Sequence, residues 1–329
     1  STGFHAPTAG QANVTNVTTA FSGAILVDQG TLPLTSAAGQ LVADFLEGST
    51  GSRPELGPEE SENYSSGFGS GVGDFNLTMD YFRINVSDRI AISDQQDFLE
   101  ALTAIGASNG VTIADGTTTF GALSALDAAG VLNVADFAGS EDLTSFGFFT
   151  NSFDTRTQGI DVVASSSYEF YDDSNTNFSL AFNWTDTEVT DIGANGPAPL
   201  SLGRQRQLEE NLPAFRGNFA INHTHGDFRG LARVNFFGEF FECHLDSVND
   251  NPAANGCDLP IDGSASVTVD LEAGYQLMEN LEIAIGARNA FDTSPTENPF
   301  SGVAGAAYPT TAPNGFNGGS YYFRVRQSF

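Results

Sequence analysis

Apolar and polar residues alternate strictly along three segments near the C-terminal end of the sequence, at 266–276, 281–292 and 321–329. Strict alternation over about ten residues predicts a β-strand with one apolar face and one polar face. Each such strand has to lie between two different environments, so the alternation restricts the chain to an all-β fold. The apolar positions of the first segment are Val267, Val269, Leu271, Ala273 and Tyr275.

Alternation alone is compatible with two architectures. In a soluble sandwich, the apolar faces of two sheets pack together and the polar faces meet water. In an outer-membrane barrel, the apolar face meets lipid, the polar face lines a wet lumen, and the strands run about 9–11 residues. A soluble secreted sandwich is therefore an alternative that this pattern leaves open.

The spacing of turns and loops favours the barrel. Short turns are predicted at Gly73, Asp173, Gly226 and Glu279, each between two alternating segments. Short periplasmic turns and long extracellular loops are typical of outer-membrane barrels, and aromatic rings gather at membrane interfaces as they gather at the strand ends here. We therefore predict a transmembrane antiparallel β-barrel portion. The long extracellular loops are expected at 13–58, 93–146, 192–208, 241–263 and 292–319.

The loop at 93–146 is predicted to contain two short helices. Ser93 and Gln96 have the spacing of a capping box, apolar residues follow at helical spacing, and Gly106 is expected to end the helix. A second helix is expected at 120–129. Because a loop this long is seldom only a connector, it is the best candidate for a folded lid or a recognition surface.

The charge balance is strongly acidic, with 41 acidic residues against 12 basic ones and a net charge of −29. Such a charge argues against binding nucleic acid through a basic patch. It fits a surface that attracts cations or lies in salty water, and equally a compositional habit of the source organism. The sequence contains no run of about 18 apolar residues, so no membrane-spanning helix is predicted. The chain starts at Ser1 without a signal region, as expected for a mature or internal fragment.

Cys243 and Cys257 lie close together in one segment rich in Asn, Asp and Pro, and predict a disulfide worth about 2–3 kcal/mol. Because His244 stands beside Cys243, a metal site with two thiolates and one His is the alternative, but the sequence shows no fourth ligand. His223 and His225 are more simply polar turn residues than a metal pair. We expect no metal and no cofactor. The sequence offers no nucleophile–base arrangement and no phosphate loop, so no enzyme activity is expected.

Several segments, in order along the chain, resemble the barrels of TonB-dependent receptors. His5 stands where that family usually has arginine, which leaves the role of this position open. The matching segments are 3–7 (GFHAP, against Gly-Phe-Arg-Ala-Pro), 56–64 (LGPEESENY, against a Leu-x-Pro-Glu strand entry), 80–90, 148–161, 289–292 (NAFD) and the terminal Phe329, which resembles the family's closing signature.

The resemblance implies a 22-stranded barrel with a plug domain and a TonB box in the outer membrane of a Gram-negative bacterium. Counting back from Phe329, the alternation predicts nine full strands and, at 1–11, part of a tenth. About nine to ten strands of a larger barrel leave two open edges, which lipid does not tolerate. We therefore expect a second polypeptide, or a further N-terminal part, to supply the plug and the early strands.

The function that the resemblance implies is uptake of a nutrient ligand with energy delivered from the inner membrane through TonB and the plug. The ligand is open: siderophore, vitamin, saccharide and peptide all fit. The other partners expected are lipid and lipopolysaccharide. A different class of function, a self-contained small outer-membrane pore or adhesin, would need the N-terminal segment to pair with the strand at 321–329.

One set of polar residues is expected to face the lumen. They either hold the plug or are the ordinary polarity of a wet lumen, and the two interpretations are equally good. The candidates are Asp80, Asp161, Arg229, Arg233, Asp270, Glu272, Arg288, Arg324 and Arg326.

Overall fold

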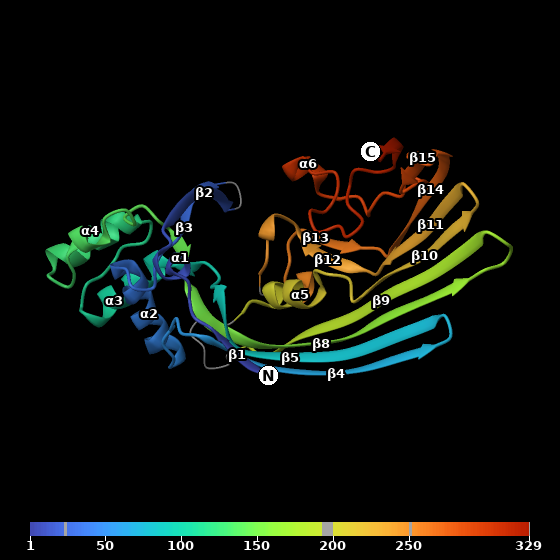
Figure 1. The fold of residues 1–329 in the computed structure, drawn as a ribbon. Coiled ribbons are helices and arrows are strands. Elements are labelled where there is room, and N and C mark those ends of the chain that lie inside the picture. Colours follow the sequence, from blue (N-terminus) through green and yellow to red (C-terminus); the bar gives the residue numbers. More distant parts are fainter. Residues whose placement is uncertain (23–24, 193–199, 250–251, 329) are drawn as a thin grey trace. The chain divides into compact units, whose positions relative to one another are not determined.

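The computed structural model describes residues 1–22, 25–192, 200–249 and 252–328 (Figure 1). In this part of the chain, ten strands form one sheet in the order β1-β4-β5-β8-β9-β10-β11-β14-β15-β16. The sheet has nine long strands and the four-residue β1, as the alternation predicts. The bounds are β1 Thr2–His5, β4 Glu59–Val72, β5 Phe75–Ile92, β8 Phe149–Tyr168, β9 Ser174–Asp191, β10 Phe215–His225, β11 Phe228–Phe237, β14 Ser266–Met278, β15 Leu281–Arg288 and β16 Ser320–Gln327.

Among the described residues, no helix has the length and apolar character needed to cross a membrane. Phe329 lies outside the described residues, so its role as a closing signature stays a prediction.

The four predicted short turns are confirmed. Each joins two consecutive strands of the sheet, through two residues at 73–74, 226–227 and 279–280 and through five residues at 169–173. Gly73 and Gly226 have φ values of +60° and +53°, a backbone conformation that glycine adopts without steric cost. Asp173 has a φ of +59°, which Asp tolerates better than most residues. The hairpins therefore follow from local turn chemistry.

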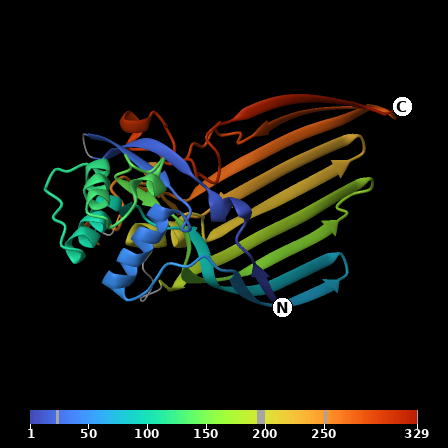
Figure 2. The same ribbon diagram turned by 90° about the vertical axis from the view of Figure 1, so that its left-hand side faces the viewer.

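The chain divides into two compact units. The second unit contains strands β10, β11, β14, β15 and β16 (Figure 2), which pair antiparallel in unbroken register apart from one irregularity near the end of β14. Here the apolar side chains are exposed, such as Ile285 at 62%, whereas the polar face holds buried groups such as Thr268 and Glu272. A soluble sandwich would bury the apolar face under a second sheet. The structure instead has the face distribution of a membrane barrel, so the sandwich alternative is wrong.

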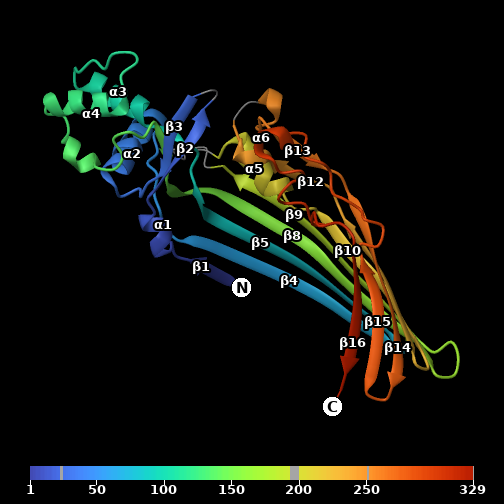
Figure 3. The ribbon, with the colours of Figure 1, turned by 90° about the horizontal axis from the view of Figure 1, so that it is seen from above.

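The first unit contains a small α/β assembly (Figure 3). Four strands pair in the order β2-β3-β7-β6, and β3 runs parallel to β7. Their core is formed by apolar side chains from both of the segments 13–58 and 93–146. The elements are α1 Ala9–Asn13, β2 Asn16–Ser22, β3 Ile25–Thr31, α2 Ala37–Thr50, β6 Gln96–Asp97, α3 Phe98–Ser108, α4 Thr119–Ala128, the 3-10 helix η1 Val134–Phe137 and β7 Ser145–Gly147.

The segment 13–58, for which the sequence predicted a long loop and no elements, carries two strands and a 14-residue helix. The second helix expected in 93–146 is confirmed as α4, within one residue at each end. Alternation is weak in these short strands. β7 pairs with β6 about fifty positions away and with β3 more than a hundred positions away, so the local pattern did not reveal this sheet.

The capping box predicted at the start of α3 is wrong. Ser93 is occupied elsewhere, because its hydroxyl accepts from the Phe148 amide at 3.1 Å, and Gln96 belongs to β6. Asp97 caps the helix instead, through a bond from the Glu100 amide at 2.8 Å. The helix also continues beyond Gly106 to Ser108.

The remaining predicted loops also contain short elements, and the last paired strand before 292–319 ends earlier than the alternation suggests. β15 stops at Arg288 because Asn289 adopts a φ of +47° and its amide bonds to the Asp270 carboxylate at 2.9 Å. That these loops are extracellular stays a prediction. Their elements are α5 Leu202–Glu210, β12 Phe240–Cys243, η2 His244–Asp246, η3 Pro252–Ala254, β13 Pro260–Gly263 and α6 Ser301–Ala304.

Candidate functional site

The candidates predicted on the last four sheet strands share one face of the second unit, here called the polar wall. Register places Arg233 opposite Asp270 and Glu272 opposite Gly286, so the alternating polar positions of β11, β14, β15 and β16 meet on the same side. The residues of the polar wall are Arg229, Arg233, Asp270, Glu272, Glu282, Arg288, Tyr322, Arg324 and Arg326.

Glu272 is the centre of the polar wall. Its side chain is 6% exposed and its Oε1 lies 2.8 Å from Nη1 of Arg229 and 2.8 Å from Nη2 of Arg324. Tyr322 donates its hydroxyl to Oε2 of the same carboxylate, and Arg229 also pairs with Glu282. A buried carboxylate is tolerated when its oxygens are paired and hydrogen-bonded in this way. Five residues of the polar wall, Arg229, Glu272, Glu282, Tyr322 and Arg324, therefore form a connected network across four strands.

Glu282 and Tyr322 are members of this network that the sequence analysis did not select. Both fall on the polar phase of their strands, opposite Arg326 and Gly286 respectively. Alternation was therefore a usable signal for both residues.

The other predicted residues of the polar wall have weaker contacts. Asp270 accepts from Nδ2 of Asn235 at 3.1 Å, and Arg288 lies 6.0 Å from the centre of the Tyr322 ring. Arg233 and Arg326 are exposed, and within the described ranges no ion pair to either is found.

Two predicted candidates lie on earlier strands of the sheet. Asp161 in β8 accepts from Nδ2 of Asn183 at 2.7 Å. Asp80 in β5 lies over Gly67 of β4, where a Cβ would meet Oδ1 of Asp80 at 2.0 Å. No hydrogen bond or ion pair given by the described residues joins either carboxylate to the Glu272 network.

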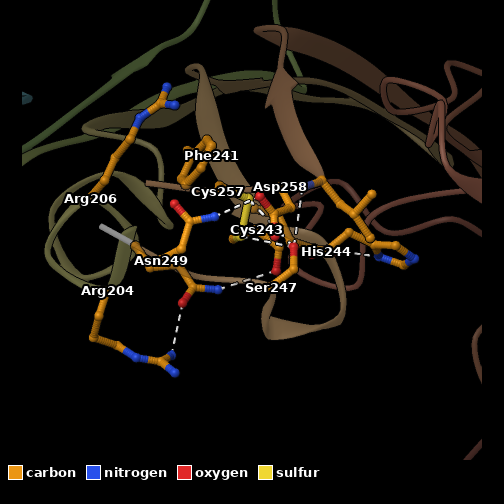
Figure 4. The surroundings of a disulfide bond; sticks show 12 residues. Arg204, Arg206, Phe241, Cys243, His244, Ser247, Asn249, Cys257 and Asp258 are labelled. Carbon is orange, nitrogen blue, oxygen red and sulfur yellow. Dashed lines mark hydrogen bonds and ion pairs between the residues drawn. A yellow bond between two sulfur atoms is a disulfide. The ribbon is translucent and has the colours of Figure 1, made fainter. Parts of the chain in front are cut away.

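Cys243 and Cys257 form a disulfide that closes the segment between β12 and β13 (Figure 4). We call β12, β13 and the segment joining them the disulfide platform. The two cysteines are 2% and 1% exposed, and the hydroxyl of Ser247 lies within 3.8 Å of both sulfurs. Both thiols are consumed by the bond, so the alternative of a thiolate metal site at Cys243 and His244 is removed.

The helix α5 is fixed to the disulfide platform by close packing and charge. Gly203 lies so close to Gly256 that a Cβ on Gly203 would meet the Gly256 carbonyl oxygen at 1.8 Å. The guanidinium of Arg206 lies 3.7 Å from the centre of the Phe241 ring and pairs with Asp262 at 2.8 Å. This helix lies partly in the predicted loop 192–208. The position of α5 depends on the contact between Gly203 and Gly256, which no local sequence pattern predicts.

A second contact joins the disulfide platform to the segment 292–319. Oε2 of the buried Glu242 accepts from the hydroxyls of Thr310 and Thr311 at 3.0 and 2.8 Å and from the Thr311 amide at 2.9 Å. Oε1 lies 3.6 Å from Nδ1 of His244, whose Nε2 lies 3.3 Å from Nδ2 of Asn298. Burial raises the pKa of Glu242, but the bonds from Thr311 and Thr310, with His244, outweigh burial and hold the pKa below its ordinary value.

Acid is expected to release this contact. A carboxyl whose pKa is lower in the folded state stabilises that state fully above its ordinary pKa of about 4.3, and the stabilisation fades as the pH falls below that value. Because the bonds go to a charged group, the loss is expected to be about 1.5–3 kcal/mol. Hydrogen exchange of residues 306–313, corrected for intrinsic rates and compared at about pH 7 and about pH 3, measures it.

Glu242→Gln should remove this acid dependence and give faster exchange in 306–313 already at neutral pH. Glu239→Gln is the matched control, because Glu239 is exposed and lies only three positions before Glu242 in the chain. Equal acid dependence in the wild type and in Glu242→Gln would show that another group is responsible.

Comparisons with known proteins agree with this architecture. The family model described as "TonB dependent receptor-like, beta-barrel" matches residues 1–290. A search of the curated proteins found no match. Among solved structures, the outer membrane transporter YddB from Escherichia coli is 10% identical with a TM-score of 0.50, and the match covers 84% of this chain and 33% of that one.

Two further solved structures are also similar to this chain. The ferripyoverdine receptor of the Pseudomonas aeruginosa outer membrane is 16% identical, with coverages of 84% and 28% and a TM-score of 0.46. The ferric yersiniabactin uptake receptor FyuA from Yersinia pestis is 12% identical, with coverages of 100% and 34% and a TM-score of 0.46. The chain thus spans 28–34% of the length of these structures. Because the family model matches most of the sequence, the chain belongs to the TonB-dependent receptor family, as part of its β-barrel domain.

Proposed function

We propose that the chain forms part of the barrel of an active outer-membrane transporter that takes up a nutrient ligand with energy from the inner membrane. The observation that supports this most directly is the distribution on the sheet of the second unit, where apolar side chains are exposed and Glu272 is buried in a charged network. Family membership supports the same conclusion. No enzymatic step is part of the proposal.

The partners follow from the two ends of the sheet. In the described part of the chain, β1 pairs with β4 and β16 pairs with β15, each on one side. Strand edges do not remain open in lipid, so we propose that further strands, from the same or a second polypeptide, pair with these edges. That remainder would supply the plug, through which TonB acts, while lipid and lipopolysaccharide cover the apolar face.

In this arrangement the loops 13–58, 93–146, 192–208, 241–263 and 292–319 lie outside the cell and the four short turns lie in the periplasm. The nine predicted polar residues then line the lumen. The α/β assembly built from 13–58 and 93–146 would serve as a lid or recognition surface at the extracellular mouth, a role supported by its own apolar core.

A self-contained pore or adhesin is the second candidate. It would require β1 and β16 to pair with each other, and such a pairing is not among those of the described residues. Extraction of the native protein in mild detergent tests this point, because a companion segment that separates only on denaturation supports the larger barrel. A folded species with the mass of this chain alone, 34.7 kDa, supports the small pore.

Energy dependence of uptake tests the function itself. Cells carrying the protein are expected to accumulate one nutrient from a panel of siderophores, vitamins, saccharides and peptides, and cells lacking it are not. Collapse of the inner-membrane proton gradient should abolish this uptake, because the transporter draws its energy from that membrane. Uptake that continues at the same rate after collapse would contradict active transport and favour a passive pore.

A further inference from the structure

A cleft of about 380 Å³ lies between α5 and the strands β9 and β10, all within the second unit. Its size is in the range of sites for small molecules. Seven of its ten lining residues are polar, and the other three, Leu208, Leu212 and Pro213, add apolar surface. The polar groups used below are Thr185, Thr187, Arg204, Gln207, Asn211 and Arg216.

The roof of the cleft is held in place by the disulfide platform. Asn211 donates from Nδ2 to the Phe241 carbonyl at 3.4 Å, and Gln207 donates from Nε2 to the Cys243 carbonyl at 3.5 Å. Nη1 of Arg204 donates to Oε1 of Gln207 at 2.8 Å. These bonds, together with the packing of Gly203 on Gly256, fix the roof side chains before any ligand arrives, which lowers the entropic cost of binding.

The floor belongs to the polar face of β9 and β10. Arg216 lies opposite Asn183 in the register and donates from Nε to its Oδ1 at 3.3 Å. Among the described residues, the hydrogen bond of the Arg216 guanidinium is made by its Nε. The Arg216 side chain is exposed. Thr185 and Thr187 add hydroxyl groups from the neighbouring strand.

The cleft concentrates positive charge in an acidic protein. The sequence has 12 arginines in total against 41 acidic residues, yet two arginines, Arg204 and Arg216, line this small volume, with Glu209 as the acidic residue among those lining it. A guanidinium presents a planar fork of donors that matches the oxygens of a carboxylate or a phosphate. Hydroxyl and amide groups beside it suit the polar groups of a hydrophilic ligand.

We propose that this cleft binds the oxyanion of a hydroxyl-rich ligand, with Arg216 as the main anchor and Arg204 and the threonines as neighbouring contacts. The proposal rests on the proposed function, because it takes the polar face of the sheet to be the one that ligands reach. It adds the chemical class of the group recognised, a carboxylate or phosphate oxyanion on a polar carrier.

Titration calorimetry on the full protein in detergent tests the proposal with three probes: galacturonate, glucose 6-phosphate and neutral galactose. One or both anionic probes should bind more tightly than galactose, and which one binds distinguishes carboxylate from phosphate. Arg216→Met should weaken that binding about tenfold or more, as expected when one charge partner is lost. Arg216→Lys should retain part of the affinity, since it keeps the charge and loses the fork.

Arg53→Met is the control, because it removes the same charge from a surface ion pair with Asp44 and Glu47 in the first unit. Equal binding of all three probes, or an equal loss in Arg53→Met and Arg216→Met, would overturn the proposal. Energy-dependent uptake together with no preference for anionic probes would reject the cleft and leave the transport function standing. Preference for an anionic probe, together with uptake that survives gradient collapse, would support the cleft and reject active transport.

Discussion

Replacing Phe98 with alanine is expected to destabilise the α/β assembly of the first unit by about 3–5 kcal/mol. Phe98 is fully buried at the start of α3. Its ring lies 5.3 Å from that of Phe146 in an edge-to-face arrangement and 6.2 Å from that of Phe137. Truncation removes these contacts and leaves a cavity, because the surrounding core relaxes only in part.

Hydrogen exchange of α2, α3 and α4 measures this loss, because local opening is reported residue by residue. Amides of β14 and β15 serve as the internal reference, since they belong to the other unit. Phe120→Ala is the matched control, because Phe120 is 53% exposed on α4 and its removal should change stability by at most about 0.5 kcal/mol. Similar exchange in the two variants would contradict the role of Phe98 in the core of the α/β assembly.

Removing the disulfide is expected to destabilise the disulfide platform by about 2–4 kcal/mol. The bond joins residues 14 positions apart, and its loss lets the unfolded segment between β12 and β13 explore many more conformations. The two sulfurs are buried beside Ser247, so the serine replacements Cys243→Ser and Cys257→Ser also place polar groups in an apolar setting. We expect β12, β13 and α5 to open together, because α5 is held by Gly203 and Arg206 against this platform.

The double-serine variant and the reduced wild type should therefore show similar, faster exchange in α5, β12 and β13. Adding reductant to the double-serine variant should change nothing further, which controls for other effects of the reductant. Faster exchange confined to 244–259, with α5 unaffected, would contradict the coupling. In that case the roof of the cleft would be held by the helix contacts alone.

The consequences for binding follow from the same geometry. Gln207 and Asn211 reach the backbone of β12 from the roof of the cleft. If the disulfide platform opens, these two side chains lose their anchors while Arg216 on β10 keeps its place. The anionic probe should then bind more weakly to the double-serine variant, although less weakly than to Arg216→Met.

The strands and hairpins of the sheet could be predicted from the sequence alone. The alternation of Val267, Leu271 and Tyr275 with polar residues predicted β14, and Gly73 and Gly226 predicted hairpin turns where the structure has them. These features depend on consecutive residues, because a strand exposes alternate side chains to opposite faces and a tight turn needs particular backbone angles. The disulfide could be predicted for a similar reason, because Cys243 and Cys257 are only 14 positions apart in the sequence.

The polar wall was predicted in part for the same reason. Alternation placed Arg229, Glu272 and Arg324 on one face, and the structure brings these three together. It could not show which charges pair, because pairing depends on the register between strands and on side-chain reach. Asp80 and Asp161 satisfy the same alternation, yet Asp161 bonds to Asn183 and neither joins the Glu272 network through the contacts of the described residues.

The folding of the long loops depends on contacts between segments far apart in the chain. The parallel pairing of β3 with β7 joins residues more than a hundred positions apart, and the core around Phe98 draws on both of the segments that this pairing brings together. Gly203 gives no local sign that α5 packs on Gly256. Glu242 likewise gives no sign that it bonds to Thr311. Such contacts depend on the complementarity of surfaces from distant segments. No short stretch of sequence contains both surfaces, so local patterns do not predict them.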